Sequence, residues 1–171
     1  MPTPCCPTPR LITALVTALI AAVIALPVPG IAASMTDVWG WPVSAPHAIW
    51  ATYQAPATRY AAGHRGIDLR ATIDDPVLAP ADGIVTFVGV VVDRPVVAIA
   101  HSGDLLSSFE PVAAAVSVGD AVVAGQRIGT VTVGGHCSGC VHFGVRLHGE
   151  YVSPLLLLGG IPRAVLLPLG P

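Results

Sequence analysis

Hydrophobic and polar residues alternate strictly along residues 140–148. The odd positions are apolar, and the even positions are polar or small. The apolar set is Val141, Phe143, Val145 and Leu147, and the other set is Cys140, His142, Gly144, Arg146 and His148. Alternation over this length predicts a β-strand with one face on a hydrophobic core and the other face open. Because the open face would carry a thiol, two imidazoles and a guanidinium, we predict that it forms the floor of a functional site.

From Pro76 onward, short apolar runs alternate with turn signals. The predicted strands cover residues 77–79, 84–92, 96–100, 105–109 and 128–133. Turn-forming Gly, Asp and Pro residues separate these runs. Short strands at this spacing are typical of antiparallel all-β domains. We therefore predict an all-β fold, with antiparallel sheets forming a sandwich-like or partly rolled single domain.

The N-terminal residues have the organisation of a secretory signal peptide. Residues 11–26 form an uninterrupted apolar run that follows Arg10 and is closed by Pro27, and residues 31–33 resemble a small-residue cleavage site. The run is shorter than the roughly 20 residues that span a bilayer comfortably. An uncleaved N-terminal anchor is the alternative. We predict a signal peptide at residues 1–33 and a location outside the cell or in the cell envelope, with membrane contact only through an uncleaved signal.

Three further segments are predicted after the signal. Residues 34–62 form an irregular lead-in rich in aromatic residues and proline, whose rings are expected to pack against the sheet. Residues 63–158 form the β domain, and residues 159–171 are a short apolar tail to which no role is assigned.

Charge and basic residues exclude two function classes. Only 11% of residues are charged and the formal net charge is −2, which argues against a nucleic-acid partner. All eight basic residues are arginines. Residues 118–129 also resemble the hairpins of biotinyl and lipoyl carriers, but these carriers attach their cofactor to a lysine, so the carrier class is excluded.

Export changes the interpretation of the two cysteines in the β domain. Outside the cytoplasm thiols tend to oxidise, so Cys137 and Cys140 are most simply a local disulfide that holds the loop entering the strand. Half of a zinc site and a redox pair are the alternatives.

Three residues form a candidate metal site. His64 and Asp68 lie four residues apart in a glycine-rich stretch, and His142 lies on the predicted open strand face. Two imidazoles and one carboxylate form a ligand mix that suits Zn²⁺. Three protein ligands leave one tetrahedral position open, as in catalytic zinc sites. The alternative is that these histidines are ordinary polar groups.

Four segments, in this order, resemble the LytM/lysostaphin-like zinc metalloendopeptidases, family twenty-three of the metallopeptidases. They are residues 63–69 (GHRGIDL), 80–85 (PADGIV), 118–129 (VGDAVVAGQRIG) and 141–146 (VHFGVR). The resemblance runs from about Gly63 to Leu158. It implies an antiparallel β fold with a groove, a single zinc, and cleavage of peptide cross-links in bacterial peptidoglycan. The family's three zinc ligands fall on His64, Asp68 and His142.

The resemblance also implies a divergent member. The family's two non-ligand active-site histidines fall on Cys140 and on Pro111. If Cys140 forms a disulfide, it cannot act as the base. General acid–base help is worth about 10²–10⁴-fold, so the departures bear directly on activity.

Several residues are candidate substitutes or substrate contacts. Glu110 is a candidate base, and His136 and His148 are candidates to reach the site. His148 is disfavoured because it lies roughly 20 Å along the strand from His142. Arg146 is a candidate contact for a substrate carboxylate.

Two functions follow from these observations. The first is a secreted zinc metalloendopeptidase acting on peptidoglycan. The alternative is a zinc-binding but catalytically inactive protein that binds the cell wall or activates another hydrolase.

Overall fold

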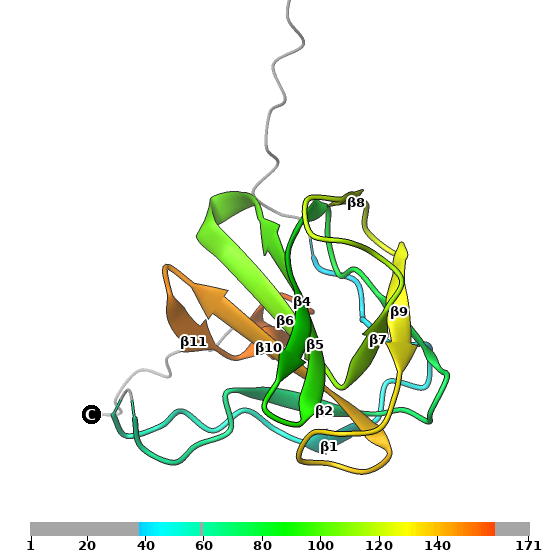
Figure 1. The fold of residues 1–171 in the computed structure, drawn as a ribbon. Coiled ribbons are helices and arrows are strands. Elements are labelled where there is room, and N and C mark those ends of the chain that lie inside the picture. Colours follow the sequence, from blue (N-terminus) through cyan, green and yellow to red (C-terminus); the bar gives the residue numbers. More distant parts are fainter. Residues whose placement is uncertain (1–37, 59, 160–171) are drawn as a thin grey trace, which may run out of the picture. The chain divides into compact units, whose positions relative to one another are not determined.

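The computed structural model describes residues 38–58 and 60–159 (Figure 1). The predicted signal peptide, the first residues of the lead-in and residues 160–171 of the predicted tail lie outside the described residues. Across these two ranges, no helix has the length and apolar character needed to cross a membrane.

The described chain folds into two antiparallel sheets. The larger sheet has the strand order β1-β2-β10-β6-β5-β4-β8, with β11 paired to β10, and the smaller sheet has the order β3-β9-β7. The strands of the larger sheet are β1 (Ile49–Ala51), β2 (Gly66–Arg70), β4 (Gly83–Val91), β5 (Arg94–His101), β6 (Leu105–Glu110), β8 (Ala121–Val122), β10 (Cys140–Leu147) and β11 (Glu150–Val152). The smaller sheet contains β3 (Pro76–Leu78), β7 (Val112–Ala114) and β9 (Arg127–Val131). Two short 3-10 turns, η1 (Ser102–Asp104) and η2 (Pro154–Leu156), complete the elements. The predicted all-β antiparallel fold is confirmed.

The core-facing side of β10 matches the predicted alternation. Val141, Phe143 and Val145 are fully buried. Phe143 stacks on Phe109, its cross-strand neighbour in β6, with ring centroids 5.1 Å apart. Side chains alternate between the two faces of a strand, so residues next to these phenylalanines lie on the opposite face of the sheet. That opposite face carries the candidate site.

The lead-in differs from its prediction in two respects. Residues 49–51 are not irregular but form β1, which pairs with β2 and satisfies backbone groups that an uncovered edge strand would leave unpaired. Trp39 is buried in the core as expected, whereas Trp50 and Tyr60 are 53% and 91% exposed. Trp50 does not pack on the core because its ring lies against the Arg70 guanidinium, 4.5 Å from the ring centroid.

Candidate metal centre

Three adjacent strands place a row of polar side chains on one face of the larger sheet. The register pairs His142 of β10 with Asp68 of β2 on one side and with Glu110 of β6 on the other. Directly opposed residues of antiparallel strands project from the same face, so their side chains are neighbours. The sheet register therefore brings residues from three distant parts of the chain to one place.

His64 enters this row from the segment just before β2. Its Nδ1 lies 2.7 Å from the carbonyl oxygen of Thr52. A carbonyl only accepts hydrogen bonds, so Nδ1 carries the proton and the lone pair of the neutral ring is at Nε2. A hydrogen bond of this kind is the usual way in which a protein fixes the tautomer and orientation of a metal-binding histidine.

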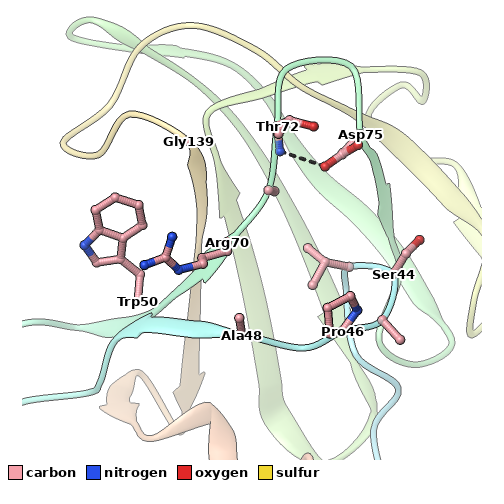
Figure 2. A pocket seen from close by; sticks show the side chains of 11 residues that line it. Ser44, Pro46, Ala48, Trp50, Arg70, Thr72, Asp75 and Gly139 are labelled. Atoms are coloured by element: carbon pink, nitrogen blue, oxygen red, sulfur yellow. Dashed lines mark hydrogen bonds between the residues drawn. The ribbon is translucent and has the colours of Figure 1, made fainter.

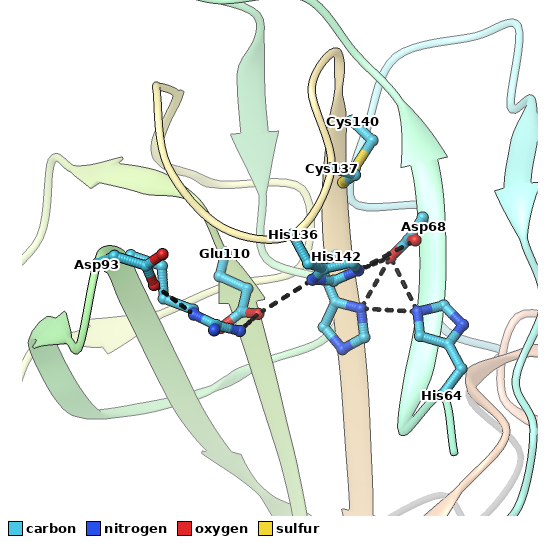
Figure 3. Close-up of polar contacts among 9 residues, drawn as sticks. His64, Asp68, Asp93, Glu110, His136, Cys137, Cys140 and His142 are labelled. Atoms are coloured by element: carbon cyan, nitrogen blue, oxygen red, sulfur yellow. Dashed lines mark hydrogen bonds and ion pairs between the residues drawn. A yellow bond between two sulfur atoms is a disulfide. The ribbon is translucent and has the colours of Figure 1, made fainter. Parts of the chain in front are cut away.

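The donor atoms of His64, Asp68 and His142 converge on one point (Figure 3). His64 Nε2 lies 3.0 Å from Asp68 Oδ1 and 3.1 Å from His142 Nδ1. His142 Nδ1 lies 2.8 Å from the same Asp68 oxygen. Donors bound tetrahedrally at zinc bond lengths lie about 3.3 Å apart, so these separations are close to those of a coordination sphere.

The protonation of His64 supplies a test of whether a cation fits here. With its proton on Nδ1, the neutral ring directs the Nε2 lone pair at the Asp68 carboxylate oxygen. Two lone pairs repel at this distance unless a proton or a metal ion lies between them. A divalent ion at the shared point satisfies both groups, so the donor set fits a metal.

A fourth histidine joins the cluster from the loop between β9 and β10. His136 Nε2 lies 3.1 Å and 3.2 Å from the two carboxylate oxygens of Asp68. One donor atom from each of His64, Asp68, His136 and His142 lies within 4.8 Å of the other three. In the sequence His136 is a candidate only as a substitute base, because a loop residue without periodic context gives no sign of where its side chain points.

Asp68 is buried and remains ionised. Burial by itself raises the pKa of this carboxyl group. The hydrogen bond with His142 lowers the pKa, and electrostatic interactions with the imidazoles of His136, His64 and His142 lower it further. The lowering effects prevail, so the pKa of Asp68 lies below its ordinary value. An anionic oxygen is therefore available to a cation.

Glu110 lies in the groove, but its carboxylate is already engaged. Oε1 accepts a hydrogen bond from Arg94 at 3.0 Å and lies 3.7 Å from His136 Nδ1. The hydrogen bond to Glu110 is also the main cause that raises the pKa of Arg94 above its ordinary value. The candidate base thus contacts Arg94 and His136, and its role as a base stays a prediction.

Cys140 departs from the predicted open face. The residue is 1% exposed, and a disulfide joins it to Cys137 (Figure 3). The bonded sulfur cannot accept a proton, and the residue is buried although the alternation assigned it to the open face.

Arg146 and His148 lie away from the four donors. Arg146 packs over the ring of Tyr151, 4.5 Å from its centroid, and donates a hydrogen bond to the Tyr151 hydroxyl. His148 follows β10 in an exposed turn, where Nδ1 lies 2.8 Å from Asp104 Oδ2. Arg146 therefore reaches the groove only through Tyr151, which forms part of the groove wall.

The three histidine donors of the cluster line a groove of about 340 Å³. Its lining residues are Gly63, His64, Arg65, Arg94, Ser108, Glu110, His136, His142 and Tyr151. Two arginines on this list place positive charge beside the donor cluster. An open, polar groove of this kind suits an extended, polar ligand better than a compact apolar one.

A second, larger hollow of about 550 Å³ lies elsewhere on the domain (Figure 2). Trp50 and Arg70 form one part of its lining, and Thr72 and Asp75 form another. The Thr72 backbone N–H donates to Asp75 Oδ2 at 2.7 Å, which closes a tight turn between β2 and β3. None of the four metal donors lines this hollow.

The fold and the site define a class: antiparallel β proteins with a candidate metal centre of histidine and aspartate beside an open groove. The chain belongs to peptidase family M23, whose match covers residues 62–154.

The chain has curated relatives in mycobacteria. It is 38% identical over 130 residues to the uncharacterized protein Rv2891 of Mycobacterium tuberculosis, a match that covers 72% of this chain and 52% of that protein. The chain thus spans about half the length of the curated relatives it matches.

Solved structures show the same fold. A mutant catalytic domain of the prophage-encoded M23 protein EnpA from Enterococcus faecalis is 26% identical, with a TM-score of 0.58 and coverage of 68% of this chain and 95% of that chain. Lysostaphin is 22% identical, with a TM-score of 0.60 over 77% of this chain and 58% of that chain. A zinc-containing peptidase from Vibrio cholerae is 22% identical, with a TM-score of 0.59 over 69% of this chain and 39% of that chain. The last two likenesses concern the fold alone.

Proposed function

We propose that this protein is a secreted zinc metalloendopeptidase that cleaves peptide cross-links of bacterial peptidoglycan. The observation that carries the proposal is the convergence of His64, Asp68 and His142, in a chain of peptidase family M23, beside a groove that the two histidines line. The match to peptidase family M23 and the apolar N-terminal run support hydrolysis and export, respectively.

The residues of the groove have separate tasks in this proposal. Zinc held by His64, Asp68 and His142 would supply Lewis acidity toward a peptide carbonyl. The Thr52 carbonyl keeps the His64 ring in the tautomer that leaves Nε2 available. Arg65 places a guanidinium at the groove wall, a group suited to binding the carboxylates of a peptide substrate.

Arg146 is proposed to contribute at the rim of the same groove. Its guanidinium packs on Tyr151, which lines the groove, so its positive charge lies one side chain away from the groove. This arrangement favours a role in attracting and orienting a carboxylate over a role in bond cleavage.

A second candidate function has a specific observation in its favour. The two positions at which the resembled family has proton-handling histidines hold a disulfide-bonded Cys140 and Pro111, and neither side chain accepts a proton. The second candidate is therefore a zinc-binding but inactive protein that binds the cell wall or activates another hydrolase.

Digestion of purified sacculi separates the two candidates. The purified protein, loaded with one equivalent of zinc, is incubated with sacculi, and the released peptides are quantified by mass spectrometry. We expect release by the unmodified protein, loss of release in His142→Ala, and unchanged release in His148→Ala, because His148 contacts Asp104 away from the site.

Two other results would decide against the peptidase. One equivalent of zinc and co-sedimentation with sacculi, without released peptides, would favour the binding protein. A protein that neither binds zinc nor associates with sacculi would refute both candidates.

A further inference from the structure

The metal centre contains one more protein donor than the three that the sequence pattern supplies. We infer that His136 is a fourth protein ligand, so that the arrangement in this structure is a closed state of the zinc site. The inference rests on the metal site of the proposed function and concerns how access to that site is regulated.

The position of the His136 ring fits a coordination sphere. Its Nε2 lies 3.1 Å from the Asp68 oxygen that also contacts His64 and His142. Its ring centroid lies 5.0 Å from that of His142 and 5.7 Å from that of His64, with nearly perpendicular ring planes. Three imidazoles around one carboxylate oxygen at such separations approach the tetrahedral set that zinc prefers.

A carboxylate lies beside the second ring nitrogen of His136. Glu110 Oε1 lies 3.7 Å from His136 Nδ1, on the side of the ring away from Asp68. A carboxylate facing one ring nitrogen favours the proton there, which leaves the lone pair of the other nitrogen for a metal. Arg94 in turn holds Glu110 in place with a hydrogen bond of 3.0 Å. The contact between Glu110 and His136 is a longer ion pair than the 2.7 Å hydrogen bond that Thr52 accepts from His64, and it favours the same arrangement of proton and lone pair.

The loop that carries His136 is anchored on both sides. Gly134, with φ of 122°, approaches the Asp93 carbonyl so closely that a Cβ there would lie 2.7 Å from that oxygen. On the other side, the disulfide between Cys137 and Cys140 ties the loop to the start of β10, two residues before His142. His136 therefore stands between two fixed points and is aimed at the donor cluster.

Burial distinguishes the four donors. The side chain of His136 is 39% exposed, whereas those of His142 and Asp68 are 12% and 6% exposed. The outermost ligand is the one that can leave without disturbing the core. Because zinc with four protein ligands has no open position, a substrate carbonyl gains access only when His136 moves away. The His136 side chain, carried by an anchored loop, thus acts as a gate on the metal.

Cobalt substitution counts the coordinated histidines without requiring activity. In the Co²⁺-loaded protein, ring protons of metal-bound imidazoles give strongly shifted NMR signals. We expect shifted signals from three histidines in the unmodified protein and from two in His136→Ala. Competition with a chelator should show that zinc affinity falls at least about 10-fold in His136→Ala and to a smaller extent in Glu110→Gln. Losing a group that supports a metal ligand typically lowers metal affinity by about 10–100-fold.

His148→Ala is the matched control, since it removes an exposed histidine that contacts only Asp104 among the contacts described, and its zinc affinity should not change. Two coordinated histidines in the unmodified protein, with unchanged affinity of His136→Ala, would overturn the inference and leave the three-ligand site intact. Failure of the unmodified protein to bind zinc or cobalt would overturn the inference together with the proposed function. The count in the unmodified protein keeps the test decisive even if a variant misfolds.

Discussion

Gly66 makes the metal centre sensitive to a single methyl group. A Cβ at this position would lie 2.4 Å from the carbonyl oxygen of Phe143 and 2.7 Å from two ring atoms of His142. The carbonyl belongs to the backbone of β10, and Asp68 holds the His142 ring, so no flexible side-chain end can turn aside. Gly66→Ala must therefore displace the His142 ring or the strand by about 1 Å to restore ordinary contact distances.

A displacement of about 1 Å is large for a side chain that binds a metal ion. Metal and catalytic groups need to be held within about 0.5 Å of their working geometry. We expect Gly66→Ala to lower zinc affinity about 10–100-fold, the range found when ligand orientation is lost. Overpacking should also lower the free energy of unfolding of the metal-free protein by about 1–3 kcal/mol. Chelator competition measures the affinity, and urea unfolding measures the stability.

Gly129 provides a matched control in the smaller sheet. A Cβ there would lie 2.4 Å from the Ala113 carbonyl oxygen, a clash as severe as that at Gly66, but β9 carries none of the four metal donors. Gly129→Ala should lower the free energy of unfolding by a similar amount and leave zinc affinity unchanged. Equal affinity of Gly66→Ala and the unmodified protein, or an equal loss of affinity in Gly129→Ala, would refute the steric argument.

Two predictions concern stability. His101 is partly buried, with Nε2 2.7 Å from Ser107 Oγ, and burial lowers its pKa. In the unfolded chain this histidine therefore takes up a proton near pH 6.5, whereas in the folded chain it does so only at lower pH. The free energy of unfolding should therefore fall as the pH drops below about 6.5. Between about pH 7.5 and 5.5, urea unfolding should show a smaller fall for His101→Gln than for the unmodified protein. An equal fall in both proteins would contradict the role given to His101. Phe143→Ala should lower the free energy of unfolding by about 3–5 kcal/mol, because it empties a fully buried position stacked on Phe109; a loss below about 1 kcal/mol in urea unfolding would contradict the packing.

The sequence pattern predicts the strand at the centre of the site well. Alternation from residue 140 onward identifies β10 because a half-buried strand has a period of two, and Phe143 and its neighbours occupy the core as expected. The pattern also places His142 on the opposite face. The same alternation is wrong for Cys140, because a local disulfide and its loop, rather than strand period, decide the exposure of that residue.

The parts that the sequence does not predict depend on contacts between distant segments. β1 is three residues long, too short for a periodic signal, and it forms only because β2 offers a partner. His136 lies in a loop whose course depends on the positive φ angles of Gly134 and Gly135 and on the disulfide that follows. Neither feature leaves a repeat in the sequence, so the fourth donor becomes apparent only in three dimensions.

The cross-strand pairing of Asp68 with His142 has a consequence for how the chain reaches its final fold. The two residues come from segments separated by 74 positions, and they face the same side only in one alignment of β2 with β10. A slip by a single residue would turn one of them to the far side of the sheet. An ion that binds both side chains therefore stabilises only the native alignment. The supply of metal then affects how much correctly folded protein accumulates.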